Sequence, residues 1–154
     1  MKTIKFLFIL LPFLIFSQQQ TLAKFIITDA SVNKSDVTET YLDAGGYIVF
    51  YTNSEGNFYM ANVMSKRDTQ SFGRLYSSEH SKLKETYEKY EADIFYFNWR
   101  YTNDYDSKKG TAKVKLVKIY KPQGIIFSCT IIPEDLDVLE YKGYMDGSVD
   151  FSRL

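Results

Sequence analysis

Residues 92–132 contain three apolar stretches joined by two short polar segments, and this arrangement limits the fold more than any other part of the chain. In the first stretch every second residue is aromatic: Phe95, Phe97, Trp99 and Tyr101. Side chains two residues apart share one face of a strand. We therefore predict a strand whose aromatic face is buried and whose opposite face, with Tyr96 and Arg100, is amphipathic.

The second stretch, residues 111–121, begins as a regular alternation of apolar residues and lysines. The alternation then changes phase, because Val117 and Ile119 are apolar while Lys118 would turn inward in a regular strand. One extra residue at Leu116–Val117 would restore the pattern, and such an extra residue is the signature of a β-bulge. We predict a bulge or a strong bend at that point.

The third stretch follows a turn. Residues 121–124 read Lys-Pro-Gln-Gly, which is typical of a type I turn. Residues 125–132 have apolar side chains on both faces, as expected for a strand that is central or covered on both sides. Pro133 ends this strand because proline has no N–H to donate. Cys129 lies on the more apolar face, so we interpret it as a packed core thiol.

The remaining segments also favour strands. The β-prone runs at residues 47–52 and 57–64 flank a short loop that ends with Gly56, a combination typical of a hairpin. Further strands are predicted at residues 22–28, 37–42, 71–76 and 138–145, with polar loops at 29–36 and 65–70.

The period changes within residues 78–91. His80, Leu83, Tyr87 and Tyr90 are spaced by 3, 4 and 3 residues, which places them on one face of a helix. We predict one helix there. Together the patterns predict a mainly β fold, formally α+β: an antiparallel curled sheet or small barrel-like meander, with the helix packed on it or capping it.

The first 17 residues have the features of an export signal. Lys2 and Lys5 are followed by an apolar run from Phe6 to Phe16, which is shorter than the roughly 20 residues of a membrane span. Cleavage after Ser17 fits this pattern, and Ala23 offers a second cleavage point. We therefore expect a secreted or periplasmic protein with one β-rich domain, residues 18–154, and no stable membrane span after cleavage.

Charge and cysteine content narrow the function classes. Removing residues 1–17 takes away two lysines, so 17 basic residues face 19 acidic ones. A mildly acidic chain lacks the basic footprint of a nucleic-acid binder, and we expect no nucleic-acid partner. A single cysteine cannot form an internal disulfide.

Catalytic and metal motifs are weak. His80 is the only histidine, so any mechanism that needs histidine must use it, and we interpret it as a packed or surface residue. The loop with Asn103, Asp104 and Asp106 resembles a calcium loop only at its start and is interpreted as a hairpin connection. We predict no metal, no cofactor and no enzymatic activity. The acidic residues of the C-terminal segment are read as solvated turns: Glu134, Asp135, Asp137, Glu140, Asp146 and Asp150.

Three functions remain open. The first is an exported, non-catalytic domain that binds a protein or envelope component. The second is a carrier of a small apolar ligand, lipocalin-like in architecture only. The third is a hydrolase that uses the carboxylates of the C-terminal segment. The candidate binding residues are Tyr96, Trp99, Arg100, Tyr101 and Phe127.

Overall fold

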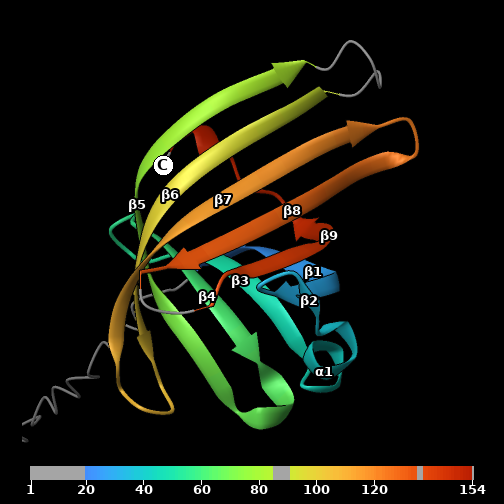
Figure 1. Ribbon diagram of the computed structural model, residues 1–154. Helices are drawn as coiled ribbons and strands as arrows, with labels where there is room; N and C mark the ends of the chain where they lie inside the picture. The colour runs from blue at the N-terminus through green and yellow to red at the C-terminus, as the bar shows by residue number, and fades with distance from the viewer. Residues whose placement is uncertain (1–19, 85–90, 135–136, 154) are drawn as a thin grey trace, which may run out of the picture.

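The computed structural model describes residues 20–84, 91–134 and 137–153 (Figure 1). The predicted export signal, residues 1–17, lies outside these residues. Eight antiparallel strands close into a barrel, which confirms the mainly β, barrel-like fold predicted from the sequence. The described residues form nine strands, and all of them except the short β2 belong to the barrel. They are β1 (Gln20–Val32), β2 (Ser35–Asp36), β3 (Gly46–Thr52), β4 (Phe58–Met64), β5 (Thr69–Lys84), β6 (Glu91–Asn103), β7 (Lys109–Lys121), β8 (Gly124–Pro133) and β9 (Leu139–Gly147).

Three short helices complete the described chain. The α-helix α1 spans Thr38–Asp43, and two 3-10 helices, η1 and η2, span Ser65–Arg67 and Phe151–Arg153. The described part of the chain contains no helix with the length and hydropathy that crossing a bilayer requires.

The sheet is a meander that β1 closes. From β3 to β9 each strand pairs with the next one in sequence, and β1 pairs with both β3 and β9. Its register shifts between Thr21 and Ala23 and again between Ile27 and Asp29. Such bulges bend a strand and increase its twist, which allows β1 to follow both neighbours around the barrel. Among the described strands, the short β2 pairs only with the end of β1.

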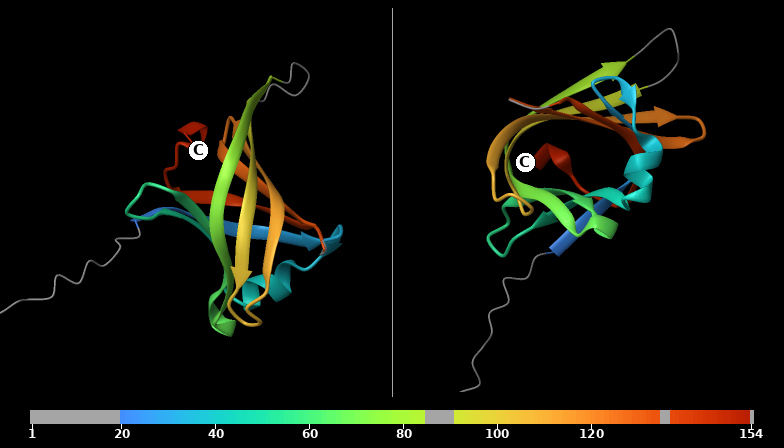
Figure 2. Two further views of the ribbon diagram at one scale, coloured as in Figure 1. Left: turned by 90° about the vertical axis from the view of Figure 1, so that its left-hand side faces the viewer. Right: turned by 60° about the horizontal axis from the view of Figure 1, so that its bottom comes forward.

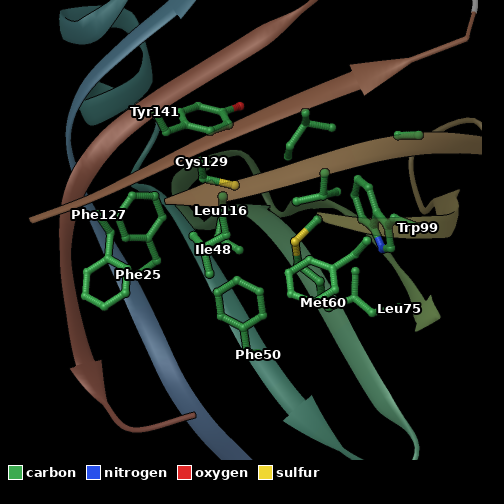
Figure 3. Close-up of a cluster of buried hydrophobic side chains, with 14 of the residues drawn as sticks. Phe25, Ile48, Phe50, Met60, Leu75, Trp99, Leu116, Phe127, Cys129 and Tyr141 are labelled. Atoms are coloured by element: carbon green, nitrogen blue, oxygen red, sulfur yellow. The ribbon is translucent and has the colours of Figure 1, made fainter. Parts of the chain in front are cut away.

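The aromatic row of β6 faces the barrel interior, as predicted. Phe95, Phe97, Trp99 and Tyr101 are each at most 9% exposed. They join a cluster of buried side chains from all the barrel strands (Figure 3). The largest fully buried members are Phe25, Ile48, Phe50, Met60, Val114, Leu116, Cys129 and Ile131. The middle of the barrel is therefore filled with side chains.

The helix predicted at about residues 78–91 is wrong where the structure describes that segment. Residues 77–84 belong to β5, and His80 and Leu83 pair with Phe95 and Ala92 of β6. Residues 85–90, which carried half of the helical pattern, lie outside the described residues. The register shift between Tyr76 and Glu79 explains the error, because a bulge interrupts the alternation that marks a strand.

The α-helix lies instead in a segment predicted to be a strand, residues 37–42. Thr38 fixes its start: its side chain and Ala30 of β1 exchange hydrogen bonds of 3.0 and 3.2 Å, and Asp36 accepts a hydrogen bond from its backbone N–H at 2.9 Å. Tyr41 then points into the barrel and is buried. The predicted loop at residues 29–36 is wrong for its first part, since β1 continues to Val32.

The bulge predicted at Leu116–Val117 is also wrong. The ladders of β7 with β6 and with β8 continue without a register shift through both residues. Lys118 is therefore on the inward face, and it lines a cavity at one end of the barrel. An inward lysine is tolerated there because the interior is open to water at that end, and Asp93 lies directly opposite on β6.

Candidate functional site

One end of the barrel holds a cavity of about 350 Å³, here called the mouth cavity. Its lining includes residues of α1, of the β4–β5 connection and of the β6–β7 connection. These three elements lie toward the bottom of Figure 1, and the right-hand view of Figure 2 looks toward this end of the barrel. Its described lining is mostly apolar and aromatic: Val32, Val37, Thr40, Tyr41, Asn62, Met64, Arg67, Thr69, Gln70, Ser71, Trp99, Tyr101, Asn103, Tyr105, Ile131, Pro133, Leu139 and Tyr141.

Two pairs of aromatic rings form much of this lining. Trp99 and Tyr101 on β6 have ring centroids 4.7 Å apart at an interplanar angle of 31°. Tyr41 on α1 and Tyr141 on β9 have centroids 5.0 Å apart at 49°. Aromatic side chains supply a large contact area at a low entropic cost because they have few rotatable bonds. The cavity therefore presents pre-ordered rings to whatever enters it.

Two glycines allow these rings to lie where they do. A Cβ on Gly46 would overlap the ring of Tyr41, and a Cβ on Gly110 would lie 2.6 Å from the ring of Tyr101. Gly110 pairs with Tyr101 across β6 and β7, so the ring lies over the backbone of the neighbouring strand. Any larger residue at either glycine would push a tyrosine out of its place.

A small polar network lies among the apolar lining residues. Tyr41 donates its hydroxyl hydrogen to Oδ1 of Asn62, and the Asn62 amide donates to the Tyr141 hydroxyl at 3.1 Å. Burial raises the pKa of Tyr141 to about 12 and raises the pKa of Tyr41 well above its ordinary value. Both phenols are therefore neutral at physiological pH and act as hydrogen-bonding groups, not as bases.

Two further polar groups distinguish the mouth cavity. Trp99 is 2% exposed, and its indole Nε1 has no hydrogen-bond partner among the described residues. Arg67, on η1, is the one charged side chain in the described lining. No aspartate, glutamate, histidine, lysine or cysteine is present in that described lining. A mostly apolar, aromatic cavity with a few polar groups suits the binding of a small molecule.

The opposite end of the barrel holds a second, more polar cavity of about 440 Å³, here called the distal cavity. Asp93 is its centre: one carboxylate oxygen lies 3.1 Å from His80 Nε2, and the other accepts a hydrogen bond of 2.7 Å from the Tyr120 hydroxyl. Partial burial acts to raise the pKa of Asp93, but the bonds from Tyr120 and His80 outweigh it and lower the pKa.

The C-terminal segment closes the distal end. Phe151 of η2 is buried, and its ring contacts Phe50, Phe95 and Phe97 at centroid distances of 5.1, 5.5 and 5.9 Å. In the right-hand view of Figure 2 this segment lies within the ring of strands. The side chain of Phe151 lies at the distal end of the filled core, and this core separates the distal cavity from the mouth cavity.

The structure separates the five predicted binding residues. Trp99 and Tyr101 line the mouth cavity, whereas Phe127 lines the distal cavity and packs against Phe25. Tyr96 and Arg100 lie on the outer face of β6, where Tyr96 is 41% exposed. Arg100 stacks on the ring of Tyr76 at 4.8 Å and donates a hydrogen bond of 3.2 Å to its hydroxyl.

The other sequence candidates lie apart from the mouth cavity. His80 is a partly exposed residue of β5 that stacks on Phe95 with a centroid distance of 4.6 Å. Cys129 is fully buried, and burial raises the pKa of its thiol to about 12, so it is not a thiolate at neutral pH.

The carboxylates of the C-terminal segment are dispersed. Asp137 accepts a hydrogen bond from Asn33 at 2.7 Å, Glu140 lines an outer groove, and Asp150 lines the distal cavity. Asp135 lies outside the described residues.

The loop at residues 104–108 connects β6 to β7, as the sequence predicted. Asp104 accepts a hydrogen bond of 2.9 Å from the backbone of Gln70, and Asp106 accepts one of 3.0 Å from the backbone of Lys108. These bonds hold the turn. Within the described ranges no group of three or more histidine, cysteine, aspartate or glutamate residues is placed to hold a metal ion.

Sequence reasoning missed most of the mouth cavity. Tyr41, Asn62, Arg67 and Tyr141 come from α1, from β4 and the adjoining η1, and from β9, and the fold brings these separate segments to Trp99. The alternation of β9 does place Tyr141 inward with Leu139, so the inward position of Tyr141 could be predicted from the sequence pattern. Nothing in the local sequence of Arg67 distinguishes it from an ordinary surface arginine.

Comparisons with known proteins add no relative. No protein-family model matches the chain, and neither a curated protein nor a solved structure matches it.

Proposed function

We propose that the protein is a non-catalytic binding protein that holds a small, largely apolar molecule in the mouth cavity. The observation that carries this proposal is a cavity of about 350 Å³ lined by two aromatic pairs and by apolar residues such as Ile131 and Leu139. Ligand sites in proteins are concave, mostly apolar and equipped with a few oriented polar groups. The mouth cavity has each of these properties.

The volume of the mouth cavity limits the size of the ligand. Binding pockets commonly span about 300–1,000 Å³, so this cavity is at the small end of the range. At about 30 Å³ per water molecule of liquid, it has room for roughly a dozen non-hydrogen atoms. A fatty acid or alcohol of about ten carbons, or a molecule with two fused rings, fits this size. A whole phospholipid does not.

Other functions have less support. A protein-binding role through Tyr96 and Arg100 stays a prediction, and Arg100 is already engaged by Tyr76 on the same surface. A hydrolase using the carboxylates of the C-terminal segment has no support from the described ones, since Glu140 and Asp150 line different cavities.

Export is part of the proposal. The first residues favour an export signal, and a binding protein in the periplasm or outside the cell would meet small apolar molecules there. Cleavage after Ser17 would leave β1 intact, whereas cleavage after Ala23 would remove four of its residues. Ala23 pairs with both Phe50 of β3 and Gly147 of β9, so we favour Ser17 as the cleavage point.

Titration with decanol tests the proposal. Trp99 is the only tryptophan of the chain and lines the cavity, so its fluorescence reports binding at this site alone. We expect a saturable change in its emission, confirmed by titration calorimetry. Leu139→Asn, which places an amide in the apolar lining, should weaken binding about tenfold, since losing one buried leucine contact costs about 1.5 kcal/mol.

The matched control is Leu83→Asn, because Leu83 is 42% exposed on β5 and does not line the cavity. This variant should bind decanol like the unmodified protein. Absence of any saturable change in Trp99 emission and of any binding heat would overturn the proposal. Equal loss of affinity in both leucine variants would do the same.

A further inference from the structure

We infer that the mouth cavity selects small amphiphiles that carry one carboxylate, with the carboxylate at Arg67 and the apolar body against the aromatic rings. This inference depends on the proposed binding function and specifies its ligand class. Its basis is the position of a single cation at the edge of an otherwise uncharged, mostly apolar lining.

The backbone that carries Arg67 is held firmly in place. Ser65 donates hydrogen bonds from its backbone N–H and its hydroxyl to the carbonyl of Gly45, at 3.3 and 2.9 Å. The backbone N–H of Lys66 donates to the carbonyl of Ala44 at 3.0 Å. Gly45 has a φ of +68°, and a Cβ at this position would lie 2.4 Å from the Ser65 hydroxyl oxygen, closer than van der Waals contact allows. The segment after α1 therefore fixes η1 and the origin of the Arg67 side chain.

The charge of Arg67 is not balanced inside the cavity. Among the described residues Arg67 forms no salt bridge, and the described lining contains no acidic side chain. A guanidinium presents several N–H donors in a planar fork that matches a carboxylate. An anionic head group at the rim would meet this fork, and a cationic one would be repelled.

The deeper lining has no charge to offer and favours an apolar body. Trp99, Ile131 and Tyr141 lie along the inner strands, and the phenols of Tyr41 and Tyr141 remain neutral because burial raises their pKa. One cation and a small volume together indicate one carboxylate on a short chain or ring system. A dianionic or zwitterionic head group would bring a second charge for which the described lining has no partner.

A comparison of decanoate with decanol tests this inference, since the two share their chain and differ in the head group. With Trp99 emission as the readout, decanoate should bind about fivefold more tightly than decanol, a modest factor because Arg67 is exposed to solvent. The preference should shrink as salt is added, because screening weakens exposed ion pairs. Arg67→Gln should abolish the preference, and Arg67→Lys should retain part of it.

Arg74→Gln is the control, because Arg74 is an exposed arginine of β5 that lies outside the cavity lining and binds Asn57 at 2.7 Å. It should keep the full preference for decanoate. If decanol and decanoate bind equally well, or if the preference survives in Arg67→Gln, the inference is wrong while the proposed binding function stands. If neither compound binds, the proposed function itself fails and the inference fails with it.

Discussion

The two ends of the barrel are built by the same long strands and have opposite chemistry. At the mouth, β6 turns Trp99 and Tyr101 inward, and the buried Tyr41 is hydrogen-bonded to the partly buried Asn62. At the distal end the same strand turns Asp93 inward, where it meets His80 and Tyr120 in a solvent-accessible cavity. The alternation along β6 thus contributes aromatic side chains to the cavity at one end and a charged side chain to the cavity at the other.

This contrast is the reason why we propose ligand binding at the mouth and not at the distal end. At the distal end the Asp93 carboxylate already has two partners, and the interior behind it is closed by Phe151. At the mouth the buried indole N–H of Trp99 lacks a partner among the described residues, and Arg67 forms no ion pair with any of those residues. Unpaired groups in an apolar cavity are expected where a ligand will complete the interactions.

Replacing Phe151, whose buried side chain closes the distal end of the barrel, should have the largest effect on stability. Phe151→Ala removes a buried ring that contacts Phe50, Phe95 and Phe97, and such a change costs about 3–4 kcal/mol of unfolding free energy. Urea unfolding measures this loss. Decanol affinity at the mouth should remain the same, because the mouth and distal cavities share no lining residue.

The matched control for Phe151 is Phe72→Ala, since Phe72 is 38% exposed on the outside of β5. It should cost well under about 1.5 kcal/mol. A loss of decanol affinity in a still-folded Phe151→Ala variant would show that the two ends are coupled. Equal stability losses in the two variants would show that Phe151 does not plug the barrel.

The sequence revealed the middle of this molecule better than its ends. The row from Phe95 to Tyr101 and the hairpin at residues 47–64 were predicted correctly, because their alternation is regular and each strand carries its own signal. At Tyr76–Glu79 a bulge hides the continuation of β5, and Lys118 turns inward where an isolated strand would be expected to avoid it. In both places the outcome depends on strands far away in sequence.

The candidate site shows the same limit. Trp99 and Tyr101 could be named from their alternation, but the pattern grouped them with Phe127, which lies at the distal cavity. Alternation tells which face of a strand is inward, and it does not tell which end of a barrel a residue reaches. The identity of the mouth follows only from the pairing of β1 with β9 and from the position of α1.

Unfolding at alkaline pH should report on the mouth of the barrel, where the phenol of Tyr141 is buried, and so sharpen the contrast between the two ends. Burial raises the pKa of Tyr141 from an ordinary value of 10.0 to about 12, so the unfolded chain loses this proton first as the pH rises. The contribution to stability is complete below about pH 10 and falls by about 1.4 kcal/mol per pH unit up to about pH 12, roughly 3 kcal/mol in total. Urea unfolding over this range measures the slope.

Tyr141→Phe should make that slope shallower, whatever its effect on stability at neutral pH. Tyr144→Phe is the control, since Tyr144 is 52% exposed and should leave the slope unchanged. An identical slope in the unmodified protein and in Tyr141→Phe would mean that the phenol is not buried as the structure places it.

Acid unfolding should give the smallest effect and should report on the distal end. The pKa of Asp93 is lowered below 3.8 because the bonds from Tyr120 and His80 outweigh the effect of partial burial. The ionised carboxylate therefore stabilises the fold above about pH 4, and this contribution disappears as the pH falls through the lowered pKa. Asp93→Asn should lose less than about 1 kcal/mol of unfolding free energy at pH 5, because Asp93 and His80 are both partly exposed. The difference from the unmodified protein should vanish near pH 2.

Tyr120→Phe should remove part of the same acid dependence, whereas Tyr144→Phe, in the same cavity, should not. A constant difference between Asp93→Asn and the unmodified protein from pH 5 to about pH 2 would show that the carboxylate is not held by charge-assisted bonds.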